Sequence, residues 1–496
     1  MRRRPSVIVA GFVCATVLLA SGACDRGDDD AAAPPTSSGP TTSSAGVGPD
    51  VPTSDQAVDV PAGDHPRGGS ARVGVWAAPD PAAPTLGGAA VRALVLPQLF
   101  VARPDGRWSP ALVEPRSDRT APDARSASFR LRAGSTWSDG TPLGVDDLRR
   151  SLDPRFVTEV QASDDGLVTL RFTSPLPGWR RLWSGQDSIP APAPGVWGGP
   201  FVVSESTPGL ETVLARNERW WGTFGPFLDE VRLVLVPDAT TARLLLARGE
   251  LDALMPPAAT ARTSQFEAIA GVSVDRVERG GWSVSVLANA TALSLEERRG
   301  LFAAMDRGPF VRTLLAGEAT QLDGFAGPED ATWVGAIVNE QAIRGLAGES
   351  VDLVGAIEEP MTPLVHRSIQ KRVRSFGGNG ARVELRAAEF DRVEGWLADG
   401  WLEAAVVVAL DPLGGCWTCR WSSAVGEDLS RAADAGDPTA VAAVETQLRD
   451  EARVLPLWRP ASIAAWRDGL RGVRANGYAA SAAWNAWEWW RPGPPG

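Results

Sequence analysis

The chain has 496 residues, a formal net charge of −11 and only two histidines. A chain of this length is too long to fold around one small hydrophobic core, so we expect two or three folded lobes. Nearly every cation is an arginine and there is no basic block, which argues against a nucleic-acid partner. The sequence has no G-x-S-x-G motif, no P-loop and no cluster of metal ligands, so we expect neither an enzyme nor a bound metal or cofactor.

The first residues read as a secretory signal. An arginine-rich start precedes an apolar run at residues 7–20, which is too short to span a bilayer. Small residues then lead to Cys24, a pattern similar to the bacterial lipobox, whose cysteine becomes the lipidated first residue of the mature protein. We expect a signal peptide at residues 1–23 and lipidation of Cys24; ordinary cleavage after Ala23, with a free thiol, is the alternative.

Residues 24–70 contain almost no large apolar side chain. A segment of Asp, Ala, Pro, Ser, Thr and Gly cannot bury enough surface to offset its chain entropy, so we expect it to be disordered. About 45 such residues have an end-to-end distance of roughly 35–40 Å. With a lipid on Cys24, this tether would hold a folded domain near the outer face of the cell membrane.

Three short segments open the expected folded part. Alternating side chains predict a strand at residues 71–76. Prolines and glycines predict a loop at residues 79–88, and an apolar segment follows at residues 91–100.

The clearest local pattern spans residues 129–152, with the sequence FRLRAGSTWSDGTPLGVDDLRRSL. Its first four residues alternate between apolar and arginine side chains, which is typical of a half-buried strand. The dipeptide Asp139-Gly140 predicts a tight turn. Residues 145–152 predict a short helix, because acidic residues in its first turn and arginines in its last complement the helix dipole.

Capping signals mark two later helices. Asp238 and Gly249 are expected to begin and end one of them. Ser294 and Glu297 match a capping box for the other. Between these helices, alternation predicts a strand at residues 282–287.

The segment from residue 351 to residue 410 shows strand, helix, strand, helix and strand patterns in turn. This order predicts a parallel sheet with helices on both faces. Ligands of such sheets bind beyond the carboxyl ends of the strands. Asp411 directly follows the last apolar strand, so it is either a ligand contact or a carboxylate that caps a turn.

Cys416 and Cys419 are separated by two residues. Such a pair can be redox-active, half of a zinc site or a small local disulfide. Zinc needs four ligands, and the chain has few other cysteines and histidines. Outside the cytoplasm, a structural disulfide is the plain expectation.

The pattern at residues 129–152 resembles the signature of the family 5 extracellular solute-binding proteins, which are the peptide, nickel and oligosaccharide receptors of ABC importers. The strand arginines, the W-S-D-G-T-P turn and the D-D-L-R-R-S-L helix correspond to successive parts of that signature. The blocks GGPF at 198–201 and LARNERWWG at 214–222 match other stretches of the family pattern. The resemblance extends from about residue 71 to residue 492.

This resemblance implies an α/β fold of the class II periplasmic-binding-protein type, with two lobes, mixed sheets and a hinge. A ligand would lie in the cleft between the lobes, which would close around it by a hinge motion. The implied boundaries are residues 71–270 for lobe I with a reduced inserted subdomain at about 97–197, residues 271–455 for lobe II, and residues 456–496 for a C-terminal return to lobe I.

The resemblance also suggests which positions face the cleft. The ligand-binding candidates are Thr85, Leu86, Trp282, Trp401, Asp411 and Trp417. Two departures from the family pattern lie near them. Gly87-Gly88 stands where the family has Asp-Pro, and Val408 stands where its peptide receptors have the Asp that pairs with the α-amino group of the peptide. Peptide binding through that particular ion pair is therefore not expected.

The implied function is that of a lipid-anchored, monomeric receptor that delivers a peptide or other small solute to an ABC permease. An alternative is that the fold serves a regulatory or scaffold role in the cell envelope without transport. The reduced subdomain, Gly87-Gly88 and Val408 favour this alternative.

Overall fold

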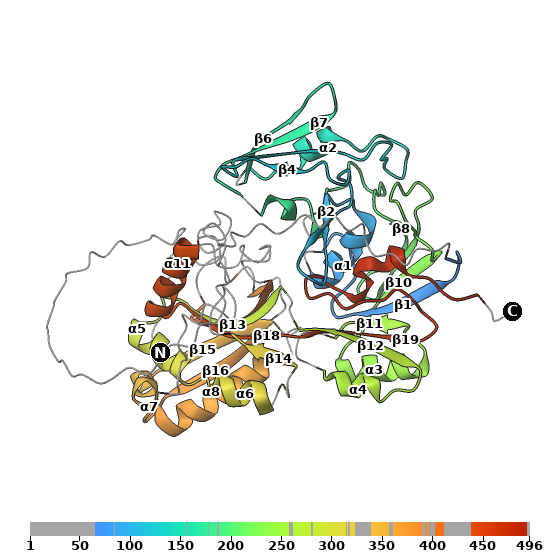
Figure 1. The fold of residues 1–496 in the computed structure, drawn as a ribbon. Coiled ribbons are helices and arrows are strands. Elements are labelled where there is room, and N and C mark those ends of the chain that lie inside the picture. Colours follow the sequence, from blue (N-terminus) through green and yellow to red (C-terminus); the bar gives the residue numbers. More distant parts are fainter. Residues whose placement is uncertain are drawn as a thin grey trace, which may run out of the picture.

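The structure is a computed structural model that describes most of the chain after residue 64. The described residues are 65–493 without 84, 155, 177, 186–187, 257–260, 279–280, 314, 316–317, 323–338, 357–360, 389–391, 394–395, 397–401 and 411–437. Figure 1 shows two large sheets beside each other, with a smaller sheet extending from the first. The chain therefore has two lobes and an inserted subdomain.

The first lobe is built on a seven-stranded mixed sheet with the order β12-β19-β11-β1-β10-β9-β8. The central strand β1 runs parallel to β10 and β11, whereas the outer pairs are antiparallel. In sheet order the strands are β12 (Val272–Val277), β19 (Ser462–Arg467), β11 (Ala253–Leu254), β1 (Ser70–Val75), β10 (Glu230–Leu235), β9 (Glu211–Arg216) and β8 (Phe201–Thr207).

Helices cover this sheet, and one of them, α3 (Ala239–Arg248), begins and ends at the predicted residues. The Asp238 carboxylate accepts hydrogen bonds from Thr240 N (2.8 Å) and Thr241 N (2.9 Å), and Gly249 ends the same helix with φ 76°. The helices of this lobe are α1 (Leu86–Val95), α3 (Ala239–Arg248), α4 (Thr263–Glu267) and the 3-10 helix η6 (Ala482–Glu488). Leu94 of α1 and Trp489, the residue directly after η6, are buried in one core with β1 and its neighbours.

The inserted subdomain carries a four-stranded antiparallel sheet with the order β4-β5-β7-β6. Phe129 of β5 stacks on Trp179 with a centroid distance of 5.5 Å, in a core that also buries Trp137. At the start of the predicted short helix, the Asp147 carboxylate accepts a hydrogen bond from Gly144 N (2.8 Å). The elements are β2 (Phe100–Ala102), β3 (Trp108–Pro110), β4 (Arg119–Thr120), β5 (Ser126–Arg130), α2 (Val145–Arg150), β6 (Val157–Ala162), β7 (Leu167–Phe172) and the 3-10 helix η1 (Trp179–Arg181).

The second lobe has a six-stranded sheet with the order β14-β18-β13-β17-β15-β16. The strand β15 runs parallel to both β16 and β17, which confirms the parallel arrangement predicted from the strand-helix order. In sheet order the strands are β14 (Ala319–Gln321), β18 (Val454–Pro460), β13 (Trp282–Ala288), β17 (Ala404–Leu410), β15 (Ser350–Ala356) and β16 (Arg382–Ala388).

Helices lie on both sides of this second sheet, with α7 and α8 on one side and α11 on the other in Figure 1. The predicted capping box is present, because Glu297 N donates to Ser294 Oγ (3.2 Å) and Ser294 N donates to Glu297 Oε2 (2.6 Å). The helices are α5 (Leu295–Ala303), α6 (Arg307–Thr313), α7 (Glu340–Ile343), the 3-10 helix η3 (Arg344–Leu346), α8 (Thr362–Phe376) and α11 (Pro438–Asp450).

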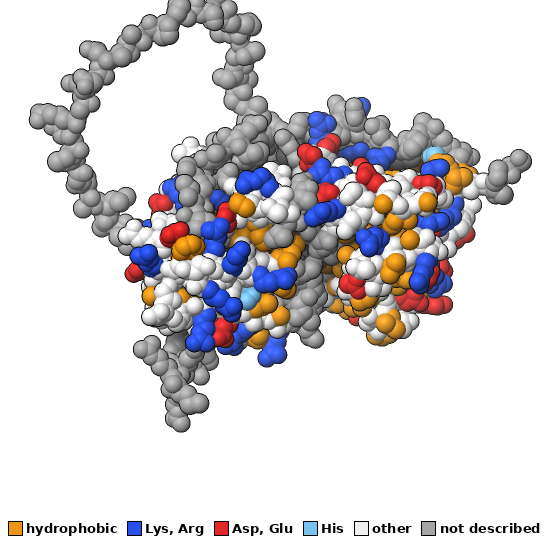
Figure 2. Space-filling model, turned by 90° about the horizontal axis from the view of Figure 1, so that it is seen from below, with side chains coloured by type: hydrophobic (Ala, Val, Ile, Leu, Met, Phe, Trp, Pro, Cys, Tyr) orange, Lys and Arg blue, Asp and Glu red, His pale blue; other side chains and the backbone are white. Residues whose placement is uncertain are grey.

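The outer face of α8 is basic. Arg367, Lys371 and Arg374 are exposed at spacings that place them on one side of the helix, opposite the buried Ile369 and Val373. In Figure 2, which views the molecule from below, basic side chains are frequent over the second lobe. This helix therefore turns its apolar side to the sheet and its charges to solvent.

Two chain segments join the lobes. The strand β12 leads into β13 through residues 278–281, and β18 leads into β19 through Ala461. In Figure 1 the second connection runs as one extended line from sheet to sheet. Both crossings come a few residues after the boundaries at 270 and 455 that the sequence suggests, because β12 still pairs with β19 and β18 still pairs with β13.

Candidate functional site at the lobe junction

Thr85 begins α1 at the carboxyl edge of the first-lobe sheet. Its hydroxyl accepts a hydrogen bond from Gly88 N (3.1 Å) and donates one to Ala78 O (3.3 Å). The expectation of a loop through residue 88 is therefore wrong, because this cap starts the helix at Leu86. The hydroxyl of Thr85 positions the start of the helix.

Leu86 lies at the junction of the two lobes. It is the first residue of α1 in the first lobe, and its partly buried side chain packs against the hydrophobic core of the second lobe. That core includes Val284, Leu353 and Trp458. Among the predicted ligand contacts whose side chains are described, Leu86 is the one that belongs to the first lobe and packs against the core of the second. Its contact with a ligand stays a prediction.

Gly87 and Gly88 follow Leu86, and the close approach of the preceding loop explains why both are glycine. A Cβ added to Gly87 would overlap the carbonyl oxygens of Ala77 and Ala78, and one added to Gly88 would overlap that of Ala83. The backbone of the loop thus rests directly on the first turn of α1. Only a residue without a side chain permits such an approach.

Long side chains brace the same region. Arg92 Nη1 donates hydrogen bonds to Pro81 O (3.0 Å) and Ala83 O (2.6 Å), which hold the loop over the helix. Trp76 Nε1 donates to Met255 O (2.6 Å), which links the chain just after β1 to the chain just after β11. The carboxyl edge of the first lobe is therefore a fixed surface.

Of the remaining ligand candidates, Trp282 lies at one end of the second-lobe sheet. Trp282 begins β13 and pairs with Leu410, the last residue of β17, and Asp411 is the next residue in the sequence. Asp411, Trp401 and Trp417 themselves lie outside the described residues, and the backbone alone of Trp282 is described. Cys24, Cys416 and Cys419 also lie outside the described residues.

Glu318 links the two lobes beside one of the crossings. Its carboxylate, on the second lobe, accepts hydrogen bonds from Thr263 N (2.8 Å), Thr263 Oγ1 (3.1 Å) and Arg276 Nε (2.9 Å), all on the first lobe. Its carbonyl oxygen accepts one from Ala461 N (2.8 Å), at the crossing itself. The Glu318 side chain is 12% exposed, so water screens this ion pair only partly. No local pattern in the sequence indicates this contact.

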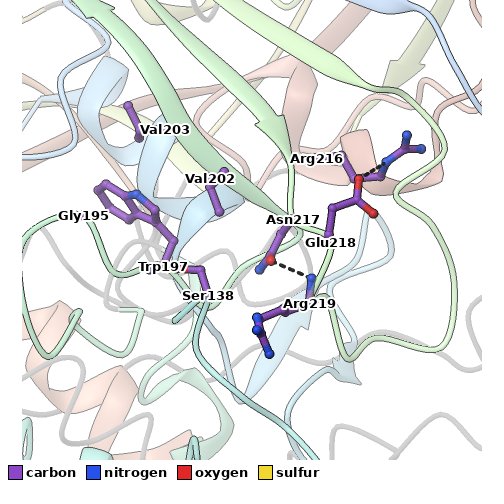
Figure 3. Close-up of a pocket in the computed structure, with 9 residues that line it drawn as sticks. All are labelled: Ser138, Gly195, Trp197, Val202, Val203, Arg216, Asn217, Glu218 and Arg219. Carbon is purple, nitrogen blue, oxygen red and sulfur yellow. Dashed lines mark hydrogen bonds and ion pairs between the residues drawn. The ribbon is translucent and has the colours of Figure 1, made fainter. Parts of the chain in front are cut away.

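A pocket lies elsewhere on the first lobe, where the sheet meets the inserted subdomain (Figure 3). Its volume is about 530 Å³. Figure 3 shows Trp197, Val202 and Val203 on one side and Asn217, Glu218 and Arg219 on the other. The lining is completed by Ser138, Gly195 and Arg216.

Hydrogen bonds join three distant sequence blocks at this pocket. Ser138 N donates to Trp197 O (2.7 Å), and Trp197 N donates back to Ser138 Oγ (3.0 Å). Asn217 Nδ2 donates to Gly199 O (2.8 Å). None of the pocket residues was among the predicted ligand contacts. The available sequence signal was that Ser138, Gly199 and Asn217 lie in stretches that match the same family pattern, one of which directly follows Trp197.

Charges at the pocket rim are largely paired. Arg216 donates from Nη2 to Asp229 Oδ1 (2.5 Å) and from Nε to Glu218 Oε1 (3.2 Å). Hydrogen bonds from the hydroxyl and amide of Thr141 hold the pKa of Asp139 below its ordinary value, and the nearby charge of Arg219 acts in the same direction. Within the described part of the chain, Arg219 itself makes no ion pair.

Two further features bear on function. No helix among the described residues combines the length and apolar character needed to cross a membrane. In the same residues, no three His, Cys, Asp or Glu side chains gather as metal ligands would.

Comparison with known proteins agrees with this architecture. Residues 107–345 match the family model of the bacterial extracellular solute-binding proteins, family 5 Middle. The oligopeptide-binding protein OppA of Mycobacterium tuberculosis is 27% identical over 187 residues, which cover 30% of this chain and 31% of that protein. Protein XP55 of Streptomyces lividans is 25% identical over 336 residues, which cover 60% of each. The chain thus spans about a third of the length of the first of these relatives and 60% of the second.

Solved structures share the fold over nearly the whole chain. The oligopeptide-binding protein AppA from Bacillus subtilis, solved in complex with a nonapeptide, superimposes with a TM-score of 0.71 at 14% identity. The match covers 87% of this chain and all of AppA, 100%. The fold is therefore that of the two-lobed periplasmic binding proteins. Just under half of the chain is thus similar to the family 5 extracellular solute-binding proteins in sequence, and most of it shares the fold of the solved binding proteins.

Proposed function

We propose that this protein is a lipid-anchored receptor on the outer face of the cell membrane, which binds a peptide or other small solute between its lobes and delivers it to an ABC importer. The observation that carries the proposal is the position of Leu86. A helix start at the carboxyl edge of one lobe packs against the core of the other, so the junction joins the surfaces where α/β sheets bind ligands. The names of OppA and AppA support peptides as the first ligand class to test.

The connections between the lobes suit a hinge. The connections at residues 278–281 and at Ala461 are short, and each follows a strand that is paired within its own sheet. Hinge closure concentrates the change in φ and ψ at a few residues at the ends of such elements. Closure over a bound ligand would bring the end of β17, and with it the proposed contact Asp411, toward Leu86.

The ammonium group of a peptide would need a partner other than residue 408. Val408 lies opposite Val284 in the ladder between β13 and β17. A valine carries no charge, so it contributes no ion pair to an α-amino group. Asp411 is the proposed replacement, and the proposed disulfide between Cys416 and Cys419 would restrain the loop that follows it.

The proposed membrane anchor is Cys24, from which the chain leads to His65 at the start of the described part. The His65 ring stacks on Trp490 with a centroid distance of 4.5 Å and meets the edge of Phe227 at 5.2 Å. These contacts fix the point where an anchoring segment would enter the first lobe.

A thermal-shift screen of the purified protein tests the receptor proposal. Peptide mixtures, oligosaccharides and lipid head groups are added separately, and a ligand at 100 times its Kd stabilises the folded state by about 2.7 kcal/mol. We expect peptides to raise the melting temperature. Substitution Leu86→Ala should weaken the binding of the active peptide about tenfold, since an apolar contact at the junction is lost.

The matched control is Leu244→Ala, because Leu244 is 49% exposed on α3 and away from the junction. It should leave peptide affinity unchanged. If no class of ligand stabilises a well-folded sample, the envelope-scaffold role, which Val408 already favours, replaces the receptor proposal. Loss of peptide uptake in cells that lack the protein would separate transport from binding alone.

A further inference from the structure

The pocket of Figure 3 lies away from the two crossings that join the lobes. The strands β12 and β19 lead to the second lobe, whereas Val202 and Val203 belong to β8, at the opposite edge of the sheet. Five strand spacings separate β19 from β8, which amounts to about 24 Å. All the residues that line the pocket belong to the first lobe and its inserted subdomain, so a molecule there would be held without the second lobe.

One side of the pocket is an apolar platform with a polar edge. Trp197 packs against the first-lobe core and stays partly exposed beside Val202 and Val203. Its Nε1 has no acceptor among the described residues, and it is not one of the buried polar atoms left without a partner. The indole N–H is thus free to donate, in the plane of the ring, to a group of the ligand that extends past the ring edge.

The other side offers hydrogen bonds without a strong net charge. The amide of Asn217 is already used, by Gly199 O and by Arg219 N (3.0 Å from Asn217 Oδ1). What remains for a ligand is the guanidinium of Arg219, the proton of the Ser138 hydroxyl and the outer carboxylate oxygen of Glu218. This set contains both donors and an acceptor.

The balance of charges decides between ligand classes. Asp139 offsets the charge of Arg219, and Glu218 is an acid at the rim, so the pocket has no surplus positive charge with which to hold an anion. A purely apolar ligand would leave the polar side desolvated without partners, at a cost of about 1–3 kcal/mol for each buried group. The fitting molecule is uncharged, has one apolar face and carries several hydroxyl groups.

We propose that this pocket is a second binding site of the protein and that its ligand is a neutral saccharide. One sugar ring would stack on Trp197, with its hydroxyl groups hydrogen-bonded to Arg219, Ser138 and Glu218. The volume of about 530 Å³ lies within the range of about 300–1,000 Å³ typical of small-molecule sites. The exposed rim at Glu218 and Arg219 leaves space for a longer chain to continue into solvent.

Titration of the full protein with maltotriose and with diacetylchitobiose tests the proposal, by calorimetry and by saturation-transfer NMR. We expect at least one of them to bind at millimolar concentration or below, with saturation transferred to one face of a sugar ring. Arg219→Ala should weaken saccharide binding about tenfold. Trp197→Phe should also weaken binding, although the phenylalanine keeps an apolar wall in the pocket. Arg219 is exposed, so its variant tests the site without disturbing the fold.

Two controls make the result specific. Arg248→Ala removes another exposed arginine of the same lobe and should not change saccharide binding. Leu86→Ala, at the lobe junction, should also leave it unchanged, which separates this site from the proposed peptide site. The proposal is overturned if neither saccharide binds, if phenylacetate binds as tightly as the saccharides, or if Arg219→Ala has no effect.

Discussion

At the scale of single residues, Gly87 is a position where packing leaves no room for a side chain. The carbonyl oxygens of Ala77 and Ala78 occupy the space in which a Cβ would lie. Gly87→Ala forces the loop away from α1, and overpacking of this kind costs about 1–3 kcal/mol. Urea unfolding should show this loss in the free energy of unfolding.

The matched control is Gly144→Ala, because a Cβ at Gly144 meets no atom within 4 Å and this residue has φ −152°, in the extended region. It should cost less than half as much as Gly87→Ala. Equal losses in the two variants would show that the loop is not held tightly against the helix.

Glu488 is a carboxyl buried within the first lobe. It is 6% exposed, and its Oε2 accepts a hydrogen bond from Asn485 Nδ2 (2.9 Å). Burial raises the pKa of Glu488 above its ordinary value, although the hydrogen bond from Asn485 and the charges of Arg474 and Arg103 act in the opposite direction. The folded protein therefore binds this proton more tightly than the unfolded chain does.

The sign of the pH dependence follows. Protonated Glu488 favours the folded state below the unfolded pKa of about 4.3, and this contribution is lost as pH rises through the higher folded pKa. The glutamine side chain of Glu488→Gln is neutral at every pH. The free energy of unfolding of this variant, relative to the native protein, should therefore rise with pH between the unfolded and the folded pKa of Glu488 and then level off. Urea unfolding at several pH values measures the difference; a constant difference, or the same rise in the exposed Glu250→Gln, would contradict the assignment.

These residues also show where sequence patterns stop being informative. The departure at Gly87-Gly88 was visible in the sequence, but its cause is a loop that folds back over the helix and leaves no periodic signal. Likewise, nothing near Glu488 in the sequence shows that it is buried, since burial depends on strands hundreds of positions away. The sequence shows the type of each residue, but it does not show which residues surround it in the folded protein.

At the scale of elements, capping signals were reliable because their hydrogen bonds are local. Asp238 and the pair Ser294 and Glu297 bond to amides within three residues, so the pattern contains the whole interaction. Thr85 is equally local and caps α1, but the glycines that follow it resemble a loop. The weak helix propensity of Gly is overcome here by packing, which the sequence does not display.

The blocks that match the family pattern have a structural role that becomes clear only in three dimensions. Ser138, Gly199 and Asn217 come from three such blocks, and the hydrogen bonds made by them and by the adjacent Trp197 tie the inserted subdomain to the first-lobe sheet. A match to a pattern indicates that these residues belong together in a family. It does not show that they meet, nor that they leave a pocket between them.

At the scale of the whole molecule, the sequence predicted the lobes but not the contacts between them. The alternation of strands and helices from residue 351 to residue 410 is enough to predict a parallel sheet. The contact of Leu86 with the second-lobe core depends on how two finished lobes approach each other. The residues that were expected to face the cleft from the second lobe lie largely outside the described part of the chain, so their roles stay predictions.

Glu318 offers a direct test of how the lobes are held. Its carboxylate accepts three hydrogen bonds from Thr263 and Arg276 across the lobe boundary. Glu318→Gln keeps the shape but removes the charge, and hydrogen bonds to charged groups contribute about 1.5–3 kcal/mol. We expect the free energy of unfolding to fall by about 1–2 kcal/mol and, in small-angle scattering, the radius of gyration of the ligand-free protein to increase as the lobes separate more readily.

The control uses the other partner of the same arginine. Glu278 lies 2.7 Å from Arg276 Nη1, but its side chain is 74% exposed and joins no second element across the boundary. Glu278→Gln should therefore change stability by less than about 0.5 kcal/mol, as exposed ion pairs do, and leave the radius of gyration unchanged. Because the two variants remove one charge each beside the same guanidinium, a difference between them reports the link between the lobes. If Glu318→Gln behaves like its control in both measurements, the lobes are held by their apolar contact at Leu86 instead.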